Sequence, residues 1–212
     1  MNFVNYILAV LLSLEPAHND KETWEQRVER MTVIAKAIDD ASSKATCQDS
    51  YDVTDCKKTW PGTKKSLGLL LVTNGYWESK FAKNVHEGKC KSYECDAHEV
   101  NGSVYHRARS PWQIQKTGLV TKDDYDKMNS SSLESTTISA SVAAKHLSLG
   151  MNSCKTIIGA LSVYGGVKSC KWDGVKIRAD FYKKLEQKSE EQLEESSQVR
   201  KKKLEERLSE KK

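Results

Sequence analysis

The chain has 212 residues, of which 38% are hydrophobic and 30% are charged, and its formal net charge at pH 7 is +5. This length allows one domain or two small ones, and the composition is typical of a globular protein with a solvated extension. The basic excess is small and scattered, which argues against a nucleic-acid reader, because such proteins concentrate their cations on one face. A mildly basic protein can still be attracted to an anionic cell wall or membrane surface.

The first segment, MNFVNYILAVLLSL, has the length of the hydrophobic region of a signal peptide. It lacks the Lys or Arg that opens such a peptide, Glu15-Pro16 is a poor cleavage site, and the apolar run is too short to span a bilayer. Its apolar residues recur at helical spacing; they are Phe3, Ile7, Val10, Leu11 and Leu14. Two interpretations of residues 1–18 follow: a buried amphipathic helix or a cleaved signal segment.

The next segment, NDKETWEQRVERMTVIAKAIDDA, predicts a second helix. Asn19 with Glu22 three residues later has the pattern of a capping box. Apolar residues then follow one face; they are Trp24, Val28, Met31, Ala35 and Ile38. We expect this face to pack in the core.

Six cysteines fall in three neighbouring couples within polar, loop-like stretches; they are Cys47, Cys56, Cys90, Cys95, Cys154 and Cys170. An even number in local couples predicts disulfides and therefore an oxidising, extracytoplasmic destination. Pairing of neighbours closes the shortest loops, so we expect Cys47–Cys56, Cys90–Cys95 and Cys154–Cys170.

Two alternatives to the disulfides remain open. The first is free thiols in a reducing compartment. The second is a zinc site, because the couple Cys90 and Cys95 lies near His98 and His106, with His86 close by. The histidine spacing is irregular for such a site, and we expect no metal and no cofactor.

A third helix is predicted in WPGTKKSLGLLLVTNGYWESKF, after the turn Pro61-Gly62 and with Thr63 as its N-cap. One face of this helix carries two leucines, an asparagine and an acid; they are Leu67, Leu71, Asn74 and Glu78. Because the face begins with leucines, it points inward and leaves the acid at the end of a buried stripe.

Glu78 has two interpretations at this position. Burial disfavours the charged form of a carboxyl group, and a neutral carboxyl can protonate a leaving group. The alternative is a structural ion pair with Lys80 or Lys83 at the helix end. Tyr76 and Trp77 beside it fit either a core or a sugar-stacking surface.

Two later helices are expected. Ser135 or Thr136 would cap the first, after a loop NSSSLESTT, and Gly150 would end it. The second carries Ile157, Leu161 and Tyr164 on one face.

Four stretches, in chain order, resemble motifs of the lysozyme-like lytic transglycosylases. GYWESKF is similar to the Glu-Ser-x-Phe motif, and HRARSPWQIQ to the Ala-x-Gly-Leu-Met-Gln-Ile block. IIGALSVYGGV resembles the Ala-x-x-Tyr-Asn-x-Gly block, and RADFYKKL the Arg-Val-x-x-Phe-Tyr-x-x-Leu end of that domain. The resemblance implies an α+β, predominantly α-helical, lysozyme-like domain over residues 19–186, between the apolar segment 1–18 and a charged tail, 187–212.

The resemblance also implies roles for individual residues. Glu78 matches the catalytic acid, Ser79 the serine beside it, Gln113 a cleft glutamine and Tyr164 the tyrosine that faces the acid. Trp112 stands where the family has methionine and is expected to stack on a sugar ring. Three further positions depart from the family: Ser110 replaces glycine, Pro111 replaces leucine and Gly165 replaces asparagine.

The activity that the resemblance implies is cleavage of the MurNAc–GlcNAc β-1,4 bond in peptidoglycan glycan strands. A single Glu protonates the glycosidic oxygen and then acts as base while the 6-hydroxyl of the sugar closes onto C1. Two alternatives are kept: a true lysozyme and a non-catalytic structural or wall-binding protein. A lysozyme needs a second carboxylate, for which Glu94, Asp96 and Glu99 are the candidates.

The tail, KSEEQLEESSQVRKKKLEERLSEKK, has few apolar residues and no heptad. The sequence predicts a solvated, frayed helix. The alternative is a segment that attaches the protein to a partner or to a phage-like particle.

Overall fold

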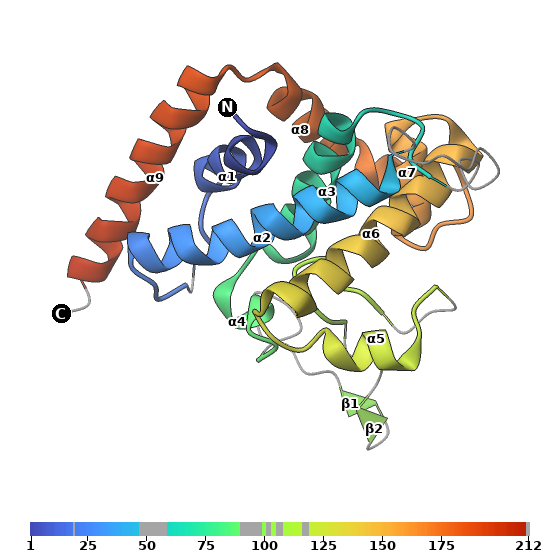
Figure 1. The fold of residues 1–212 in the computed structure, drawn as a ribbon, viewed down its shortest axis with the longest axis horizontal. Helices are drawn as coiled ribbons and strands as arrows, with labels where there is room; N and C mark the ends of the chain where they lie inside the picture. The colour runs from blue at the N-terminus through green and yellow to red at the C-terminus, as the bar shows by residue number, and fades with distance from the viewer. Residues whose placement is uncertain are drawn as a thin grey trace.

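The computed structural model describes residues 1–18, 20–46, 59–89, 99–100, 103–104, 108–115 and 119–210, and this part is predominantly helical (Figure 1). The longer helices are α1 (Phe3–Ser13), α2 (Trp24–Ala45), α3 (Lys64–Ser79), α6 (Leu133–Cys154), α7 (Ile157–Tyr164), α8 (Lys176–Gln187) and α9 (Glu190–Ser209). The shorter elements are α4 (Lys83–His86), α5 (Lys122–Lys127), the 3-10 helix η3 (Asp173–Val175) and the strands β1 (Glu99–Val100) and β2 (Ser103–Val104).

The predominantly helical class is therefore confirmed, whereas the β component is small. Within the described ranges the named strands are the antiparallel pair β1 and β2, each two residues long, with Glu99 opposite Val104 and Val100 opposite Ser103.

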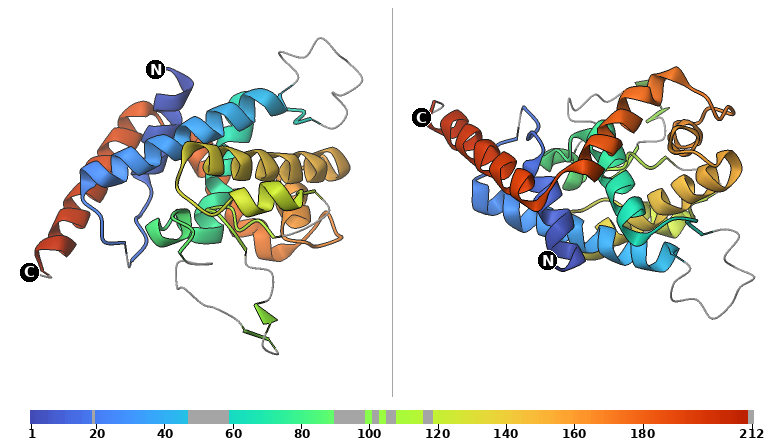
Figure 2. Two further views of the ribbon diagram at one scale, coloured as in Figure 1. Left: turned by 60° about the horizontal axis from the view of Figure 1, so that its bottom comes forward. Right: turned by 90° about the horizontal axis from the view of Figure 1, so that it is seen from above.

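The two long helices α2 and α6 pack against each other in the middle of the molecule, and α3 packs against both α2 and α8. Figure 2 shows α9 at one end of the molecule and α7 at the other. Helix α1 packs between α2, α3 and α9, so it is covered by a helix that lies far from it in the sequence.

Helix α1 is a packed helix with a buried apolar face. Ile7, Val10 and Leu11 have no exposed surface, and Leu14 is 5% exposed. Over Phe3–Ser13 the structure contains a packed amphipathic helix, one of the two interpretations of residues 1–18, while the cleaved signal segment stays a prediction. No helix of the described chain combines the length and the apolar character that crossing a membrane requires.

The start of α2 differs from the expectation. The N-cap is Thr23, whose side chain accepts from the backbone N–H of Gln26, while the Gln26 side chain accepts in return from the N–H of Thr23. The capping box is therefore four residues later than expected, and Asn19 lies outside the described residues. Glu22 is instead buried.

Glu22 is the centre of a buried ionic cluster. Its side chain has no exposed surface and accepts from Arg30 at 2.6 and 2.8 Å and from Arg27 at 3.3 Å. Arg30 also donates to the backbone carbonyl of Phe81 at 2.5 Å, and Asp20 accepts from the backbone N–H of Lys83 at 2.8 Å. The cluster thus connects the loop before α2 to the chain that follows α3.

Helix α6 begins earlier and ends later than expected. Ser132 is its N-cap, so the second half of NSSSLESTT is helical, and the helix continues through Gly150 to Cys154. Gly150 allows a close approach to α7, because a Cβ atom there would lie 2.9 Å from the Cα and the carbonyl oxygen of Ala160. It is a packing glycine, and the prediction that it ends the helix was wrong.

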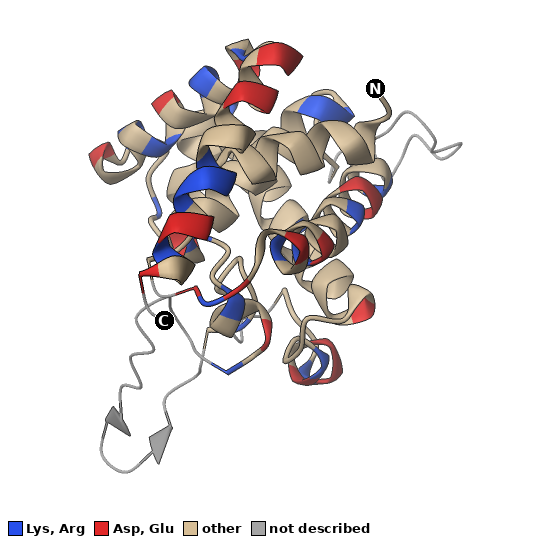
Figure 3. Cartoon of the chain, turned by 90° about the vertical axis from the view of Figure 1, so that its left-hand side faces the viewer, with Lys and Arg blue, Asp and Glu red and all other residues tan. Residues whose placement is uncertain are grey.

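The tail packs against the domain, contrary to the expectation of a solvated helix. Ser189 and Gln192 form a capping box at the start of α9, and Leu193 and Leu204 are 0% and 1% exposed. Arg200 and Arg207 both contact the carboxylate of Glu15, at 3.2 and 3.5 Å. Figure 3 looks at this side of the molecule and shows acidic and basic residues interspersed on its helices.

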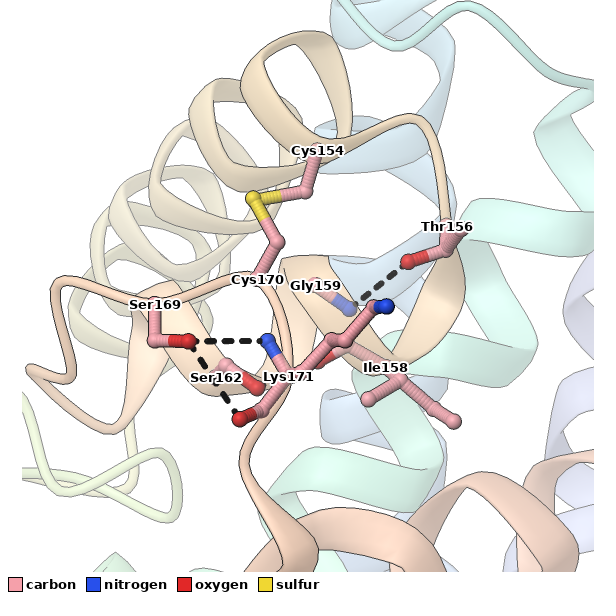
Figure 4. Close-up of a disulfide and its surroundings, with 8 residues drawn as sticks. All are labelled: Cys154, Thr156, Ile158, Gly159, Ser162, Ser169, Cys170 and Lys171. Carbon is pink, nitrogen blue, oxygen red and sulfur yellow. Dashed lines mark hydrogen bonds between the residues drawn. A yellow bond between two sulfur atoms is a disulfide. The ribbon is translucent and has the colours of Figure 1, made fainter.

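The disulfide Cys154–Cys170 is confirmed, with Cα atoms 5.3 Å apart. It joins the end of α6 to the segment after α7 (Figure 4). The other predicted pairs, Cys47–Cys56 and Cys90–Cys95, lie outside the described residues.

The zinc alternative falls mostly on residues outside the described ranges, which omit its two cysteines as well as His98 and His106. Across the described residues, no group of three His, Cys, Asp or Glu side chains is placed to hold a metal ion. His86 is 1% exposed, and its Nε2 lies 2.8 Å from the hydroxyl of Thr136.

A substitution in α9 tests whether the tail is part of the fold. Leu204→Ala should lower the free energy of unfolding by about 2–4 kcal/mol, because it removes a fully buried side chain and leaves a cavity. Val199→Ala in the same helix is the control; this side chain is 52% exposed, and the change should stay within about 0.5 kcal/mol. Urea unfolding of the three proteins measures both values, and equal effects of the two substitutions would contradict the packing of α9.

The buried imidazole of His86 makes stability depend on pH. Burial, followed by the charge of Arg30, lowers the pKa of His86 to about 3, while an unfolded histidine titrates at about 6.5. Between these values the unfolded chain binds a proton that the folded chain does not bind, so the free energy of unfolding falls as the pH is lowered through this range.

The expected loss from this residue is about 1.4 kcal/mol per pH unit, or about 2 kcal/mol at pH 5. His86→Gln has no group that titrates there, and its stability should fall less steeply between pH 7.5 and pH 5. Urea unfolding at a series of pH values compares the two slopes. Parallel slopes would refute the assignment.

Candidate active-site cleft

Glu78 lies in the last turn of α3, on the face that the sequence predicts. The N-cap is Thr63, as expected, and Leu67, Leu71 and Asn74 on this face have no exposed surface. The side chain of Glu78 is 22% exposed, so the face passes from the core to solvent at this residue. Position and partial burial agree with the expectation for an acid at the edge of a cleft.

The chain turns sharply after Glu78. Lys80 and Phe81 have φ angles of 55° and 51°, a left-handed conformation that costs non-glycine residues about 1–2 kcal/mol each. Ser79 stabilises the turn, because its hydroxyl donates to the carbonyl of Gly75 and accepts from the N–H of Phe81, both at 3.1 Å. Ser79 is fully buried and does not line the cleft, so its role is structural. It has no exposed surface with which to make the substrate contact that was expected of it.

The cleft beside Glu78 has a volume of about 370 Å³ and is formed by α3, α6, α7, α8 and the turn at residues 110–115. Its lining is polar and aromatic on several sides; the residues used below are Glu78, Gln113, His146, Tyr164, Trp172 and Arg178. Glu78 is the one carboxylate among the described residues that line it. The structure therefore brings together three of the five residues expected in the site.

Glu78 is ion-paired, but with neither of the lysines considered from the sequence. Its Oε1 accepts from Arg178 of α8 at 2.5 Å, and the same guanidinium lies 3.4 Å from the side-chain oxygen of Asn74. Lys80 extends over the ring of Tyr76, 4.1 Å from its centroid, and Lys83 pairs with Glu87. The Glu78–Arg178 ion pair therefore joins α3 to α8 at the cleft.

Tyr164 comes from the end of α7 and faces the same cleft. Its hydroxyl donates to the carbonyl of Trp112 at 2.6 Å. Burial raises the pKa of Tyr164 well above its usual range, and the negative charge of Glu78 adds to this effect. The phenol therefore stays neutral and keeps its hydrogen-bond donor at physiological pH.

Gln113 lies in a tight turn that places its side chain at the cleft. An antiparallel bridge between Arg109 and Ile114 closes the turn, and the Gln113 amide donates to the carbonyl of Ser110 at 3.1 Å. Ser110 and Gln113 have φ angles of 67° and 50°. Ser110 therefore adopts the left-handed conformation that glycine tolerates without strain, at the position where the resembled family has glycine.

Trp112, which precedes Gln113 in the same turn, has no exposed surface. Its indole N–H donates to the carbonyl of Leu71 at 2.9 Å, and its ring meets Phe81 edge-on. It anchors the turn to α3, so the expectation that it stacks on a sugar is not met in this structure. Tyr76 and Trp77 pack against Phe181 and do not line the cleft either.

Three cleft residues were not expected from the sequence. Trp172 is 38% exposed and offers the aromatic surface that was expected of Trp112. His146 packs edge-on against Tyr164, its Nε2 is buried without a hydrogen-bond partner, and burial lowers its pKa. Arg178 is the first residue of the RADFYKKL motif, but nothing in that motif predicts that its side chain contacts Glu78.

The three candidates for the second carboxylate of a hydrolase fall on residues whose side chains the structure does not describe. Glu94 and Asp96 are outside the described ranges, and for Glu99 the structure describes the strand but not the side chain. Comparison of the chain with protein-family models, curated proteins and solved structures found no match. The resemblance to transglycosylases therefore depends on the four motifs alone.

The strained conformation of Ser110 gives a prediction of unusual sign. Ser110→Gly should raise the free energy of unfolding by up to about 1 kcal/mol, because it relieves the left-handed backbone. Ser141→Gly, in the middle of α6, is the matched control and should lower it by about 0.5–1 kcal/mol. Thermal and urea unfolding measure both changes; destabilisation of similar size at the two positions would contradict the backbone argument.

Proposed function

We propose that the protein cleaves the MurNAc–GlcNAc β-1,4 bond of peptidoglycan as a lytic transglycosylase on a lysozyme-like domain, with Glu78 as acid and then base. The observation that carries this proposal is that Glu78, Gln113 and Tyr164, which come from three separate motifs, line one cleft. These three motifs are far apart in the chain, and the meeting of their residues in one cleft supports the motif matches.

The cleft has the groups that a glycan needs. The side-chain amide of Gln113 offers hydrogen bonds to sugar hydroxyl and acetamido groups, and Trp172 offers a face for ring stacking. The Tyr164 hydroxyl, which donates to the Trp112 carbonyl, offers its oxygen as an acceptor. In this proposal Trp172 takes the stacking role, because Trp112 is occupied in the core.

The reaction needs one carboxyl group that changes role. Protonated Glu78 gives its proton to the glycosidic oxygen, and the bond between that oxygen and C1 breaks. The 6-hydroxyl of the muramyl sugar then bonds to C1, and its proton returns to Glu78. Protons balance over the cycle, and the products are a free 4-hydroxyl on one fragment and a 1,6-anhydro end on the other.

Arg178 determines when this cycle can begin. In the free cleft its guanidinium contacts Oε1 of Glu78, and the acid role requires this oxygen to be released. A bound glycan must displace this contact before Glu78 takes up a proton, which happens most readily once the sugar has excluded water from the cleft.

The same ion pair favours a second candidate function, which is binding of wall glycan without cleavage. If Arg178 stays on Glu78 in the complex, the cleft remains a polar, aromatic-lined binding site. A location outside the cytoplasm, free or on a phage-like particle, suits both functions, and so does the disulfide Cys154–Cys170.

Glu78→Gln tests the proposal, because it keeps the shape of the side chain and removes the transferable proton. We expect the rate of release of soluble fragments from purified walls to fall at least about 100-fold, without a loss of fold by circular dichroism. Glu134→Gln, at an exposed position of α6, is the control and should keep full activity.

Mass spectrometry of the fragments decides the reaction type, since an anhydro end is one water lighter than a reducing end. Reducing muramic acid ends would replace the transglycosylase with a lysozyme. Wild-type protein that binds walls but releases no fragments would favour the binding function.

A further inference from the structure

Two further cavities lie alongside α9, the helix at the opposite end of the molecule from α7 (Figure 1). The larger, of about 530 Å³, lies between α1 and the first half of α9, and the smaller, of about 350 Å³, between the start of α2 and the end of α9. Trp24 lines both of them, so they adjoin, and we call them together the α9 furrow.

The floor of the α9 furrow is apolar. Leu8 and Leu12 of α1 and Trp24 of α2 line it and are only half-buried, although the same helices bury other apolar side chains completely. Half-buried apolar side chains that gather in one depression are a common feature of protein interaction sites.

The rim of the furrow is acidic, although the chain as a whole has a net charge of +5. Glu190, Glu191 and Glu194 line the larger cavity, and Glu25 and Glu205 line the smaller one. Neither cavity has a Lys or Arg among its described lining residues. Lys201 comes within 4.0 Å of Glu205 at the smaller cavity. Met1, which carries the N-terminal amino group, lines the larger cavity together with the three carboxylates.

The helix dipole accounts for only part of this charge. Glu190 and Glu191 are in the first turn of α9, where carboxylates are stabilised by the helix N-terminus. Glu194 is beyond that turn, where the dipole effect has largely faded, and all three are exposed and face the apolar floor. The pattern is therefore that of an apolar groove with an anionic edge.

We propose that the α9 furrow binds an amphipathic helix of a partner protein, with apolar side chains on one face and Lys or Arg along its flanks. Such a helix buries its apolar face on Leu8, Leu12 and Trp24 and places its cations beside Glu190, Glu191 and Glu194. Helix α9 has 20 residues and is therefore about 30 Å long, which gives room for four to five turns of a partner helix.

This binding is separate from the cleft and does not depend on the proposed function. It agrees with the interpretation of the tail as an attachment segment. In this proposal α9 is folded onto the domain and forms one wall of the attachment site.

A synthetic amphipathic peptide tests the proposal. The probe is a fluorescein-labelled helix of about fifteen residues built from Leu and Lys at helical spacing, and its counterpart has Glu in place of every Lys. Fluorescence anisotropy is measured with the full-length protein in about 0.15 M salt, where exposed charges beyond about 8 Å are screened. We expect the Lys peptide to bind and the Glu peptide to bind at least 10-fold more weakly.

Two matched charge-reversal variants localise the binding. Glu190→Lys, Glu191→Lys and Glu194→Lys together should weaken binding of the Lys peptide at least 10-fold. The control reverses three exposed acids elsewhere, Asp123→Lys, Glu134→Lys and Asp180→Lys, which gives the same change in net charge. The control should change binding less than 3-fold, and Leu12→Glu, which alters the floor, should weaken it as the rim variant does.

Three outcomes would overturn the proposal. The first is equal weakening by the rim and control variants, which would mean that only net charge matters. The second is equal binding of the Lys and Glu peptides. The third is a dimer in analytical ultracentrifugation that the rim variant disrupts and the Lys peptide does not, which would assign the furrow to a second copy of the chain. Thermal melts by circular dichroism verify that every variant is folded.

Discussion

The buried carboxylate of Glu22 is the constraint on which the rest of the structure depends. An ionised carboxylate without solvent is tolerated only when it is paired and hydrogen-bonded, and here two guanidinium groups satisfy it. Arg30 uses its remaining donors on the Phe81 carbonyl, which fixes the chain just after α3. The ring of Phe81 then packs against Gly75 and Trp112, so the ionic cluster reaches the turn that carries Gln113 through one aromatic side chain.

The cleft is bounded by residues whose backbone conformation is locally unfavourable. Lys80 and Phe81 on one side and Ser110 and Gln113 on the other all have positive φ angles without being glycine. Each such residue costs of order 1–3 kcal/mol, and strain of this kind persists only where the surroundings over-determine it. Burial of Phe81 and the hydrogen bonds of Ser79 supply that determination, and the result is a rigid border to the cleft.

Local patterns in the sequence were sufficient to predict part of the candidate site. The N-cap at Thr63 and the face that leads to Glu78 depend on spacings of three and four residues, and both are in the structure. The Glu78–Arg178 pair joins residues 100 positions apart, and no spacing rule reaches that far. Trp112 was misassigned because an exposed and a buried tryptophan look alike in a sequence.

Helix α9 was misjudged for a different reason. Its two fully buried residues, Leu193 and Leu204, are three helical turns apart, and the positions between them on the same face are polar or charged. Arg200 fills one of these positions and uses its charge on Glu15, which lies just beyond α1. A pattern based on apolar residues alone therefore finds two isolated leucines in α9 and predicts no buried face.

The contact between α1 and α9 has a consequence for how the chain folds during synthesis. Arg200 of α9 hydrogen-bonds the carbonyl of Ser13, 187 residues earlier in the chain. Translation adds about 5–20 residues per second, so α1 waits of the order of ten to forty seconds before its covering helix exists. During this interval the apolar face of α1 that α9 covers is accessible to chaperones or export factors, and the packing of α9 removes that access.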